Sequence, residues 1–255
     1  MASLVSEAQV AFPSQLTAKD IYVGPLKNAP QVGNAKVPVV LFMHGSSGLG
    51  LKAIADWQQW LASFGVASFG PIDIDPASPA YGTFTSTPKP GWAGARFHDV
   101  LGQFGVPIAV DTDVNGAALG EWLKGAGQGC TTLAYTTVGT GIGGGLVING
   151  NALRGARGAA GDIGHTQSTR AHGAQCRCGH VGCVEAVAGG WALVQVLEER
   201  GVHADNVSDV ARLVRDGDPV ATSQVRAATK VVGQAVAQAV SLLNPDTVVI
   251  AGELL

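Results

Sequence analysis

The chain has 255 residues, of which 46% are hydrophobic and 14% charged, with a formal net charge of −3 at pH 7. This length suffices for one two-lobed domain or two small ones with buried cores. The charge gives no reason to expect binding to nucleic acid or to an anionic membrane. Apolar stretches such as 37–43 are strand-sized, so we expect neither a signal peptide nor a membrane span. The few, clustered cysteines favour a reducing, cytoplasmic location.

The N-terminal third predicts a β-α-β unit after a weakly patterned start. Residues 1–35 carry several prolines and no sustained periodicity, which indicates a mobile or edge segment. Residues 37–43 form a buried-strand pattern, 51–63 have helical spacing of apolar residues, and 65–69 begin a second strand. Two such strands should be parallel and joined by a right-handed crossover.

The rest of the chain alternates strand and helix patterns, which predicts an α/β fold. Residues 70–92, rich in Pro and Gly, should be loop and short strand. Ser208 is the expected N-cap of one helix, and Pro245 should end another. The expected strands are 106–110, 133–138, 145–148 and a buried 247–251, and the expected helices are 191–200, 209–216 and 220–243.

Three of the four cysteines lie close together, with a histidine upstream. Three thiolates and one imidazole complete a tetrahedral shell for a structural Zn²⁺. Gly179 and Gly182 suit the tight turns that would bring the thiolates together. His172 and His180 are alternative imidazole ligands, and free surface thiols are the alternative to a metal site. The predicted ligands are His165, Cys176, Cys178 and Cys183.

Two further features indicate chemistry on phosphate and hydroxyl groups. Asp113 follows the apolar strand 106–110, where a carboxylate can act as a general base, although a helix N-cap is an equally physical role. The glycine-rich run 139–145 joins two strand patterns, and its amides could form an anion nest. Hairpin turns also collect glycine.

These motifs resemble those of the ROK family of sugar kinases and sugar-responsive repressors. The similarity begins with Gly161-Asp162-Ile163-Gly164-His165, followed by Cys-x-Cys-Gly-x-x-Gly-Cys-x-Glu, and includes 111–121, 138–145 and 244–252. It extends from about Ala67 to the C-terminus. The chain resembles a mosaic, in which the type of protein it resembles changes near 64–70 and near 146–152.

The resemblance implies a two-lobed actin-like ATPase (ribonuclease-H-like) fold with an atypical N-terminal segment, with lobes at 1–107 and 108–255. It implies ATP-dependent phosphorylation of a fructose- or glucose-class hexose in the inter-lobe cleft, with Mg²⁺ and with Asp113 as the base. A homodimer is an expected assembly. The implied sugar ligands are Asn115, Asp162 (usually glutamate in the family), His165 and Glu185. The implied phosphate and ATP ligands are Gly139, Thr140, Gly141, Gly143, Gly144 and Gly252.

The sequence also departs from the family pattern. The first Asp-x-Gly-Gly-Thr phosphate loop is absent, and the chain stops at Leu255 where the family continues, so we expect sugar binding to survive better than ATP use. Residues 36–69 instead resemble an α/β-hydrolase segment, but no Gly-x-Ser-x-Gly elbow follows, which disfavours a hydrolase. A non-catalytic sugar-binding relative of the repressor branch is the second hypothesis. Residues 1–66 predict no basic recognition helix, which disfavours DNA binding.

Overall fold

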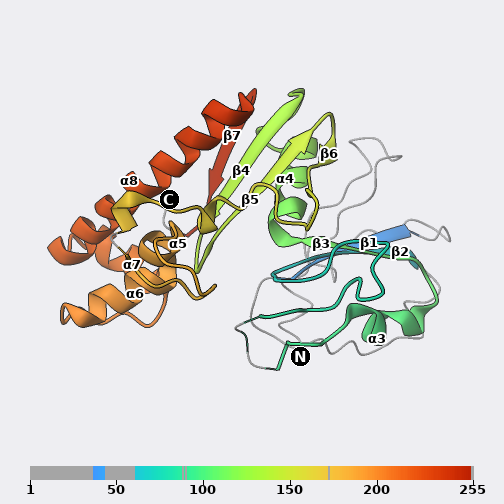
Figure 1. Ribbon diagram of the computed structural model, residues 1–255, viewed down its shortest axis with the longest axis horizontal. Coiled ribbons are helices and arrows are strands. Elements are labelled where there is room, and N and C mark those ends of the chain that lie inside the picture. The colour runs from blue at the N-terminus through green and yellow to red at the C-terminus, as the bar shows by residue number, and fades with distance from the viewer. Residues whose placement is uncertain (1–36, 44–60, 88, 90, 172, 254–255) are drawn as a thin grey trace. The chain divides into compact units, whose positions relative to one another are not determined.

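The computed structural model divides into two compact units, Met1–Gly116 and Ala117–Leu255. The sequence had suggested a lobe boundary at 107/108. Residues 108–112 fall in the first unit because they pair with its sheet. Figure 1 draws the described part of the chain in colour, which comprises residues 37–43, 61–87, 89, 91–171 and 173–253.

The first unit contains a parallel sheet of order β1-β2-β3, formed by Val37–Met43, Leu61–Ser68 and Ile108–Thr112. The predicted parallel pairing of the first two strands is confirmed. The predicted helix over 51–63 is wrong at its end, because Leu61 already pairs with Val37. Phe64 and Val66 are buried in β2, and hydrogen bonds to strands on both sides favour the extended backbone. Residues 44–60 lie outside the described part.

An aromatic core supports this sheet. Phe69, Phe84 and Phe97 are buried, and the Phe84 ring lies 4.8 Å from that of Phe69 and 5.4 Å from that of Phe97, centroid to centroid. Phe97 begins helix α3 (Phe97–Leu101), which continues into the 3₁₀ turn η2 (Gly102–Phe104). The predicted loop 70–92 is therefore anchored through Phe84, which packs between Phe69 and Phe97 on either side of it in sequence.

The second unit is built on a four-stranded sheet of order β6-β5-β4-β7 (Figure 1). Strands β4 and β5 form an antiparallel hairpin, and β7 is parallel to β4. The strand predicted at 247–251 is present, but the prediction that it is buried was wrong, because Val248 is 37% exposed and Ile250 43% exposed. These two residues alternate along β7, so one face of the strand is partly exposed, and within the described residues β7 pairs only with β4. The bounds are Thr132–Val138 (β4), Ile142–Ile148 (β5), Asn151–Ala152 (β6) and Thr247–Ala251 (β7).

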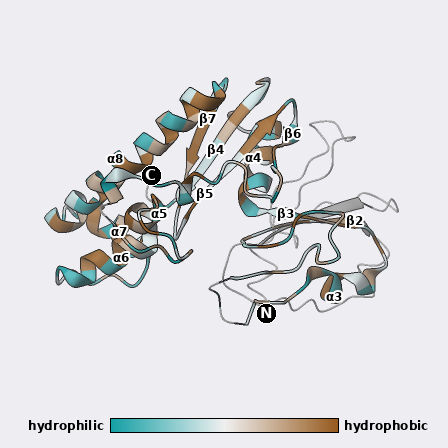
Figure 2. Cartoon of the chain, in the orientation of Figure 1, coloured by the Kyte–Doolittle hydropathy of each residue, from teal (hydrophilic) through white to brown (hydrophobic). Residues whose placement is uncertain are grey.

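Helix α4 (Asp113–Lys124) follows β3, and the remaining helices follow the hairpin. The long α8 contacts α5, α6, α7 and η3 and shows alternating apolar and polar bands in Figure 2. Leu193, Leu197 and Val210 are fully buried in the cluster beneath it. The bounds are Ile163–His165 (η3), Thr169–Ala171 (η4), Glu185–Ala188 (α5), Gly190–Glu199 (α6), Val207–Arg215 (α7) and Pro219–Leu243 (α8).

The helix ends refine the sequence-based expectations. Helix α7 is capped by Asn206, whose side-chain oxygen accepts from the Asp209 amide at 3.1 Å, so the prediction of Ser208 as N-cap was wrong. Ser and Asn both cap well, and the helix begins at Val207, two residues earlier than the apolar spacing indicated. Helix α8 ends at Asn244 in the left-handed conformation, directly before Pro245. No helix within the described ranges has the length and apolar character needed to cross a bilayer.

Candidate functional site

The predicted cysteine and histidine ligands come together in the second unit. One ligand atom from each of His165, Cys176, Cys178 and Cys183 lies within 4.8 Å of the others. A Zn–S bond of about 2.3 Å gives tetrahedral ligand–ligand edges of about 3.8 Å. The Cys178 and Cys183 sulfurs are 3.7 Å apart, as are the Cys176 sulfur and His165 Nδ1. The donor set and its spacing fit a Zn²⁺ ion.

The loop backbone explains how three close cysteines converge. The Gly179 amide donates to the Cys176 carbonyl at 3.0 Å, which closes a tight turn between two ligands. Gly179 and Gly182 have φ values of +91° and +84°, a region that other residues rarely adopt. Both turn glycines predicted from the sequence therefore have the required conformation.

Burial affects the ionisation of the cluster's thiols. Burial, together with the neighbouring Cys176 and Cys178 thiols, raises the pKa of the Cys183 thiol to about 12. Burial likewise raises the pKa of the Cys176 thiol. Thiols are metal ligands only as thiolates, so binding of a divalent cation supplies the charge that compensates their ionisation.

His180 contacts one ligand of the cluster but is not among its four grouped residues. Its Nδ1 lies 3.5 Å from the Cys178 sulfur, whereas the four-ligand grouping contains His165. His172, the other alternative ligand, lies outside the described residues.

Three predicted sugar ligands gather beside this cluster. Burial raises the pKa of the Asp162 carboxyl above its ordinary value; His165 opposes this shift and Glu185 reinforces it, so the three groups are within electrostatic reach. Glu185 begins α5, and its Oε2 accepts from the Ile142 amide at 2.8 Å. Its Oε1 accepts from the Trp191 indole at 3.2 Å. Each carboxylate oxygen retains acceptor capacity for a hydroxyl group.

The predicted phosphate glycines divide into two structural groups. Gly139, Thr140 and Gly141 form the turn between β4 and β5, whereas Gly143 and Gly144 lie within β5. A Cβ at Gly139 would meet nothing within 4 Å, so steric packing does not explain that glycine. A Cβ at Gly144 would lie 2.0 Å from the Gly161 carbonyl oxygen, which makes this position a packing requirement.

Gly252 also has a steric reason for being glycine. It follows β7 with a φ of +139°, and a Cβ there would lie 2.0 Å from the Val138 carbonyl oxygen. Its backbone therefore lies directly against the end of β4, next to the 139–141 turn. This placement brings the predicted C-terminal glycine to the same end of the sheet as the turn.

Asp113 and Asn115 belong to the first unit, at the start of α4. The Thr112 hydroxyl accepts from the Asn115 amide at 3.2 Å, so Thr112 provides the cap that had been the alternative role of Asp113. Burial lowers the pKa of the Lys89 ammonium, and the Asp113 carboxylate opposes that shift. Lys89 Nζ also lies 3.6 Å from the centroid of the Phe69 ring. A lysine is thus held in the electrostatic neighbourhood of the predicted base.

Asn115 has an unsatisfied acceptor. Its side chain is buried, with 2% exposure of the residue, and its Nδ2 donates to Asp111 Oδ1 at 2.7 Å. Its Oδ1 has no hydrogen-bond partner among the described residues. Buried acceptors are normally satisfied, so this atom suits a ligand hydroxyl or a water.

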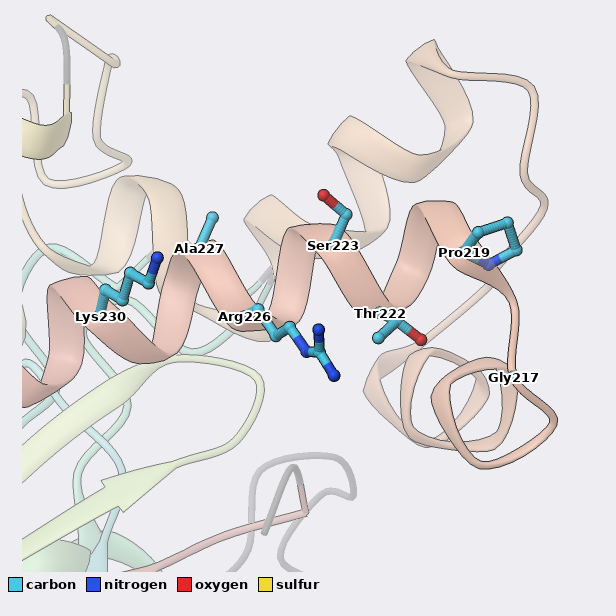
Figure 3. Close-up of a pocket in the computed structure, with 7 residues that line it drawn as sticks. All are labelled: Gly217, Pro219, Thr222, Ser223, Arg226, Ala227 and Lys230. Carbon is cyan, nitrogen blue, oxygen red and sulfur yellow. The ribbon is translucent and has the colours of Figure 1, made fainter.

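A surface hollow lies elsewhere, along α8 (Figure 3). It has a volume of 540 Å³ and is lined by small and hydroxyl side chains together with Arg226 and Lys230. None of the predicted site residues lines it. The hollow is therefore separate from the predicted residues of the second unit.

Sequence reasoning missed Lys89 near Asp113 in the first unit, and Arg177 and Trp191 near the Cys/His cluster in the second. The Arg177 guanidinium lies 4.4 Å from the Trp191 ring, and Trp191 also bonds Glu185. An arginine between two cysteine ligands was visible in the sequence, but its aromatic partner was not, because the contact depends on the fold.

Comparisons with known proteins identify the class of fold and then the family. A ROK hexokinase from Thermus thermophilus is similar with a TM-score of 0.66 and 34% identity, over 78% of this chain and 65% of that one. A glucokinase from Streptomyces griseus, in complex with glucose and AMPPNP, is similar with a TM-score of 0.62 and 30% identity. The match covers 75% of this chain and 65% of that one. The α/β actin-like ATPase fold expected from the sequence is thereby confirmed.

The sequence profile of the ROK family matches residues 51–255, and the chain belongs to this family. A fructokinase from Zymomonas mobilis subsp. mobilis is 43% identical over 147 residues, which are 56% of this chain and 48% of that protein. The chain thus spans about half the length of this relative. The family match begins at residue 51, earlier than Ala67, the start expected from the sequence motifs. The hydrolase-like interpretation of 36–69 stays a prediction.

Proposed function

We propose that this chain is a sugar phosphotransferase that transfers the γ-phosphoryl group of ATP to a hydroxyl group of a fructose- or glucose-class hexose. The observation that carries the proposal is the grouping of Asp162 and Glu185 with His165, a member of the Cys/His cluster, while Glu185 bonds the Ile142 amide directly after the 139–141 turn. Paired carboxylates with an imidazole recognise adjacent hydroxyl groups, and a glycine turn suits phosphate.

In the proposed reaction the sugar hydroxyl gives its proton to Asp113 as it attacks phosphorus. Glu185, held by the Trp191 indole and the Ile142 amide, accepts from a sugar hydroxyl in a fixed orientation. His165 presents Nδ1 to the Cys/His cluster, which leaves Nε2 for the sugar. Asn115 uses its unpaired Oδ1 for a further hydroxyl group.

Zinc on the cluster would be structural, because its shell of three thiolates and one imidazole is closed. Its contribution is to fix the loop that carries His165 and precedes Glu185. ATP would enter as its Mg²⁺ complex, the usual substrate in phosphoryl transfer. Gly139, Thr140 and Gly141 would contact phosphate oxygens. We further propose a cytoplasmic location, a homodimer and no role in nucleic-acid binding.

The test is ADP release from ATP and Mg²⁺ over a panel of hexoses, including fructose, glucose and mannose. Sugar-dependent release supports the proposal, and it should fall by roughly 10²-fold or more in Asp113→Asn, which keeps the shape but removes the base. Sugar binding without release would support the non-catalytic, repressor-like alternative. Release that is independent of any sugar would contradict the proposal.

A further inference from the structure

Trp191 contacts three features of the second unit at once. Its ring lies 4.4 Å from the guanidinium carbon of Arg177. Its indole N–H donates to Glu185 Oε1 at 3.2 Å, and its main-chain amide donates to the Thr140 carbonyl at 3.1 Å. One residue therefore joins the Cys/His loop, the candidate sugar carboxylate and the glycine turn.

The glycine turn is fixed by further contacts from the same segment. The Gly190 amide donates to the Gly139 carbonyl at 2.9 Å, and Glu185 Oε2 accepts from the Ile142 amide at 2.8 Å. A Cβ at Gly141 would lie 2.7 Å from Glu185 Oε2. Glu185 Oε2 therefore lies directly against Gly141, and its bond to the Ile142 amide links the carboxylate to the residue that follows the turn.

Arg177 stands between two of the cluster's cysteines, Cys176 and Cys178. When both thiolates hold one ion, the backbone at Arg177 is fixed from both sides. The guanidinium is then held over the Trp191 ring, where a cation is attracted by the aromatic face. The Cys176 amide donates to the His180 carbonyl at 2.8 Å, so the loop backbone is partly held without a metal, whereas the exposed Cys178 gains its fixed position from the ion.

We propose that Arg177 and Trp191 are positioning residues that couple metal binding at the Cys/His cluster to the order of the 139–141 turn. Metal fixes Arg177, Arg177 holds the Trp191 ring, and Trp191 holds both Glu185 and the turn. The consequence for phosphate binding rests on the proposed function, in which this turn contacts ATP. The coupling itself is independent of it.

The experiment is hydrogen–deuterium exchange of the full chain, followed by mass spectrometry, with zinc bound and after removal of zinc by a chelator. Neither sugar nor nucleotide is present, so failure of the coupling and failure of the proposed function are distinguishable. In the wild type, zinc should slow exchange in peptides that cover 139–145. In Arg177→Ala the slowing should shrink by roughly two- to fivefold, the factor that corresponds to one cation–π contact at an exposed site.

Matched variants separate this role from a general effect on folding. Arg177→Lys keeps a cation and should retain most of the slowing. Arg170→Ala removes an arginine of the same segment whose Nε bonds Gln234 instead of a ring, and it should behave as the wild type. Trp191→Phe keeps the ring but loses the bond to Glu185, so it should bind zinc and lose part of the slowing.

Zinc content is measured for each variant, and about one ion per chain is expected in all of them. Wild-type slowing in Arg177→Ala would overturn the proposal. So would the absence of any zinc effect on the turn in the wild type. Loss of zinc from Arg177→Ala would also overturn it, because it would assign Arg177 to metal affinity and not to positioning.

Discussion

Replacement of Gly164 by alanine should damage both the stability of the second unit and its metal site. Gly164 lies in η3, between Asp162 and His165, and packs against the first residue of β5. A Cβ at this position would be 2.0 Å from the Ile142 carbonyl oxygen, whereas real Cβ atoms essentially never approach closer than 3.0 Å. The two backbones must therefore separate by about 1 Å.

The magnitude follows from this displacement. Overpacking of a tightly packed contact costs about 1–3 kcal/mol. For a domain of this size that is a fall in melting temperature of roughly 2–12 °C. Because His165 is the next residue, the imidazole moves with the backbone, and zinc ligand distances tolerate only about 0.2 Å. Zinc affinity should fall by roughly 10- to 100-fold, as for other losses of ligand orientation.

The assay combines thermal unfolding with competition for zinc against a chromogenic chelator. Gly233→Ala is the matched control, because a Cβ at this α8 glycine meets nothing within 4 Å. It should raise stability by about 0.5–1 kcal/mol and leave zinc affinity unchanged. The steric argument is refuted if Gly164→Ala has the melting temperature of the wild type and binds zinc with equal affinity.

The remaining predictions concern the metal ligands and a helix cap. His165→Ala should lose the zinc while His180→Ala keeps it, as measured by metal analysis of the purified proteins; the reverse result would reassign the imidazole ligand. Asn206→Ala should cost about 1 kcal/mol in chemical unfolding, and Ser208→Ala less than about 0.5 kcal/mol, because Asn206 caps α7. Equal losses in the two variants would contradict that assignment.

The metal cluster could be predicted from the sequence because the chemistry of its ligands is local. Three cysteines within one short segment can reach a single ion whatever the surrounding fold, and Gly179 needs only a turn. The long α8 was equally accessible, since its apolar spacing and Pro245 define it without tertiary information. Strand β7 could also be predicted, because its apolar run is a local signal. Its partial exposure could not, because exposure depends on which strands lie beside it.

The contacts that organise the site could not be predicted in this way. Glu185 bonds the Ile142 amide across 43 positions of sequence, and no local pattern specifies that pair. The contact of Arg177 with Trp191 likewise depends on how α6 packs beside the cysteine loop. Leu61 followed a helical spacing, and tertiary pairing with β1 placed it in a strand.

The most direct test of the account is a calorimetric titration of fructose and glucose into the zinc-loaded and the zinc-stripped protein. If the Cys/His cluster positions His165 and Glu185 for sugar, one of these hexoses should bind the loaded protein. Removal of zinc should weaken that binding by roughly tenfold or more. Equal affinity in the two forms, or no binding of either hexose to the loaded protein, would contradict the account.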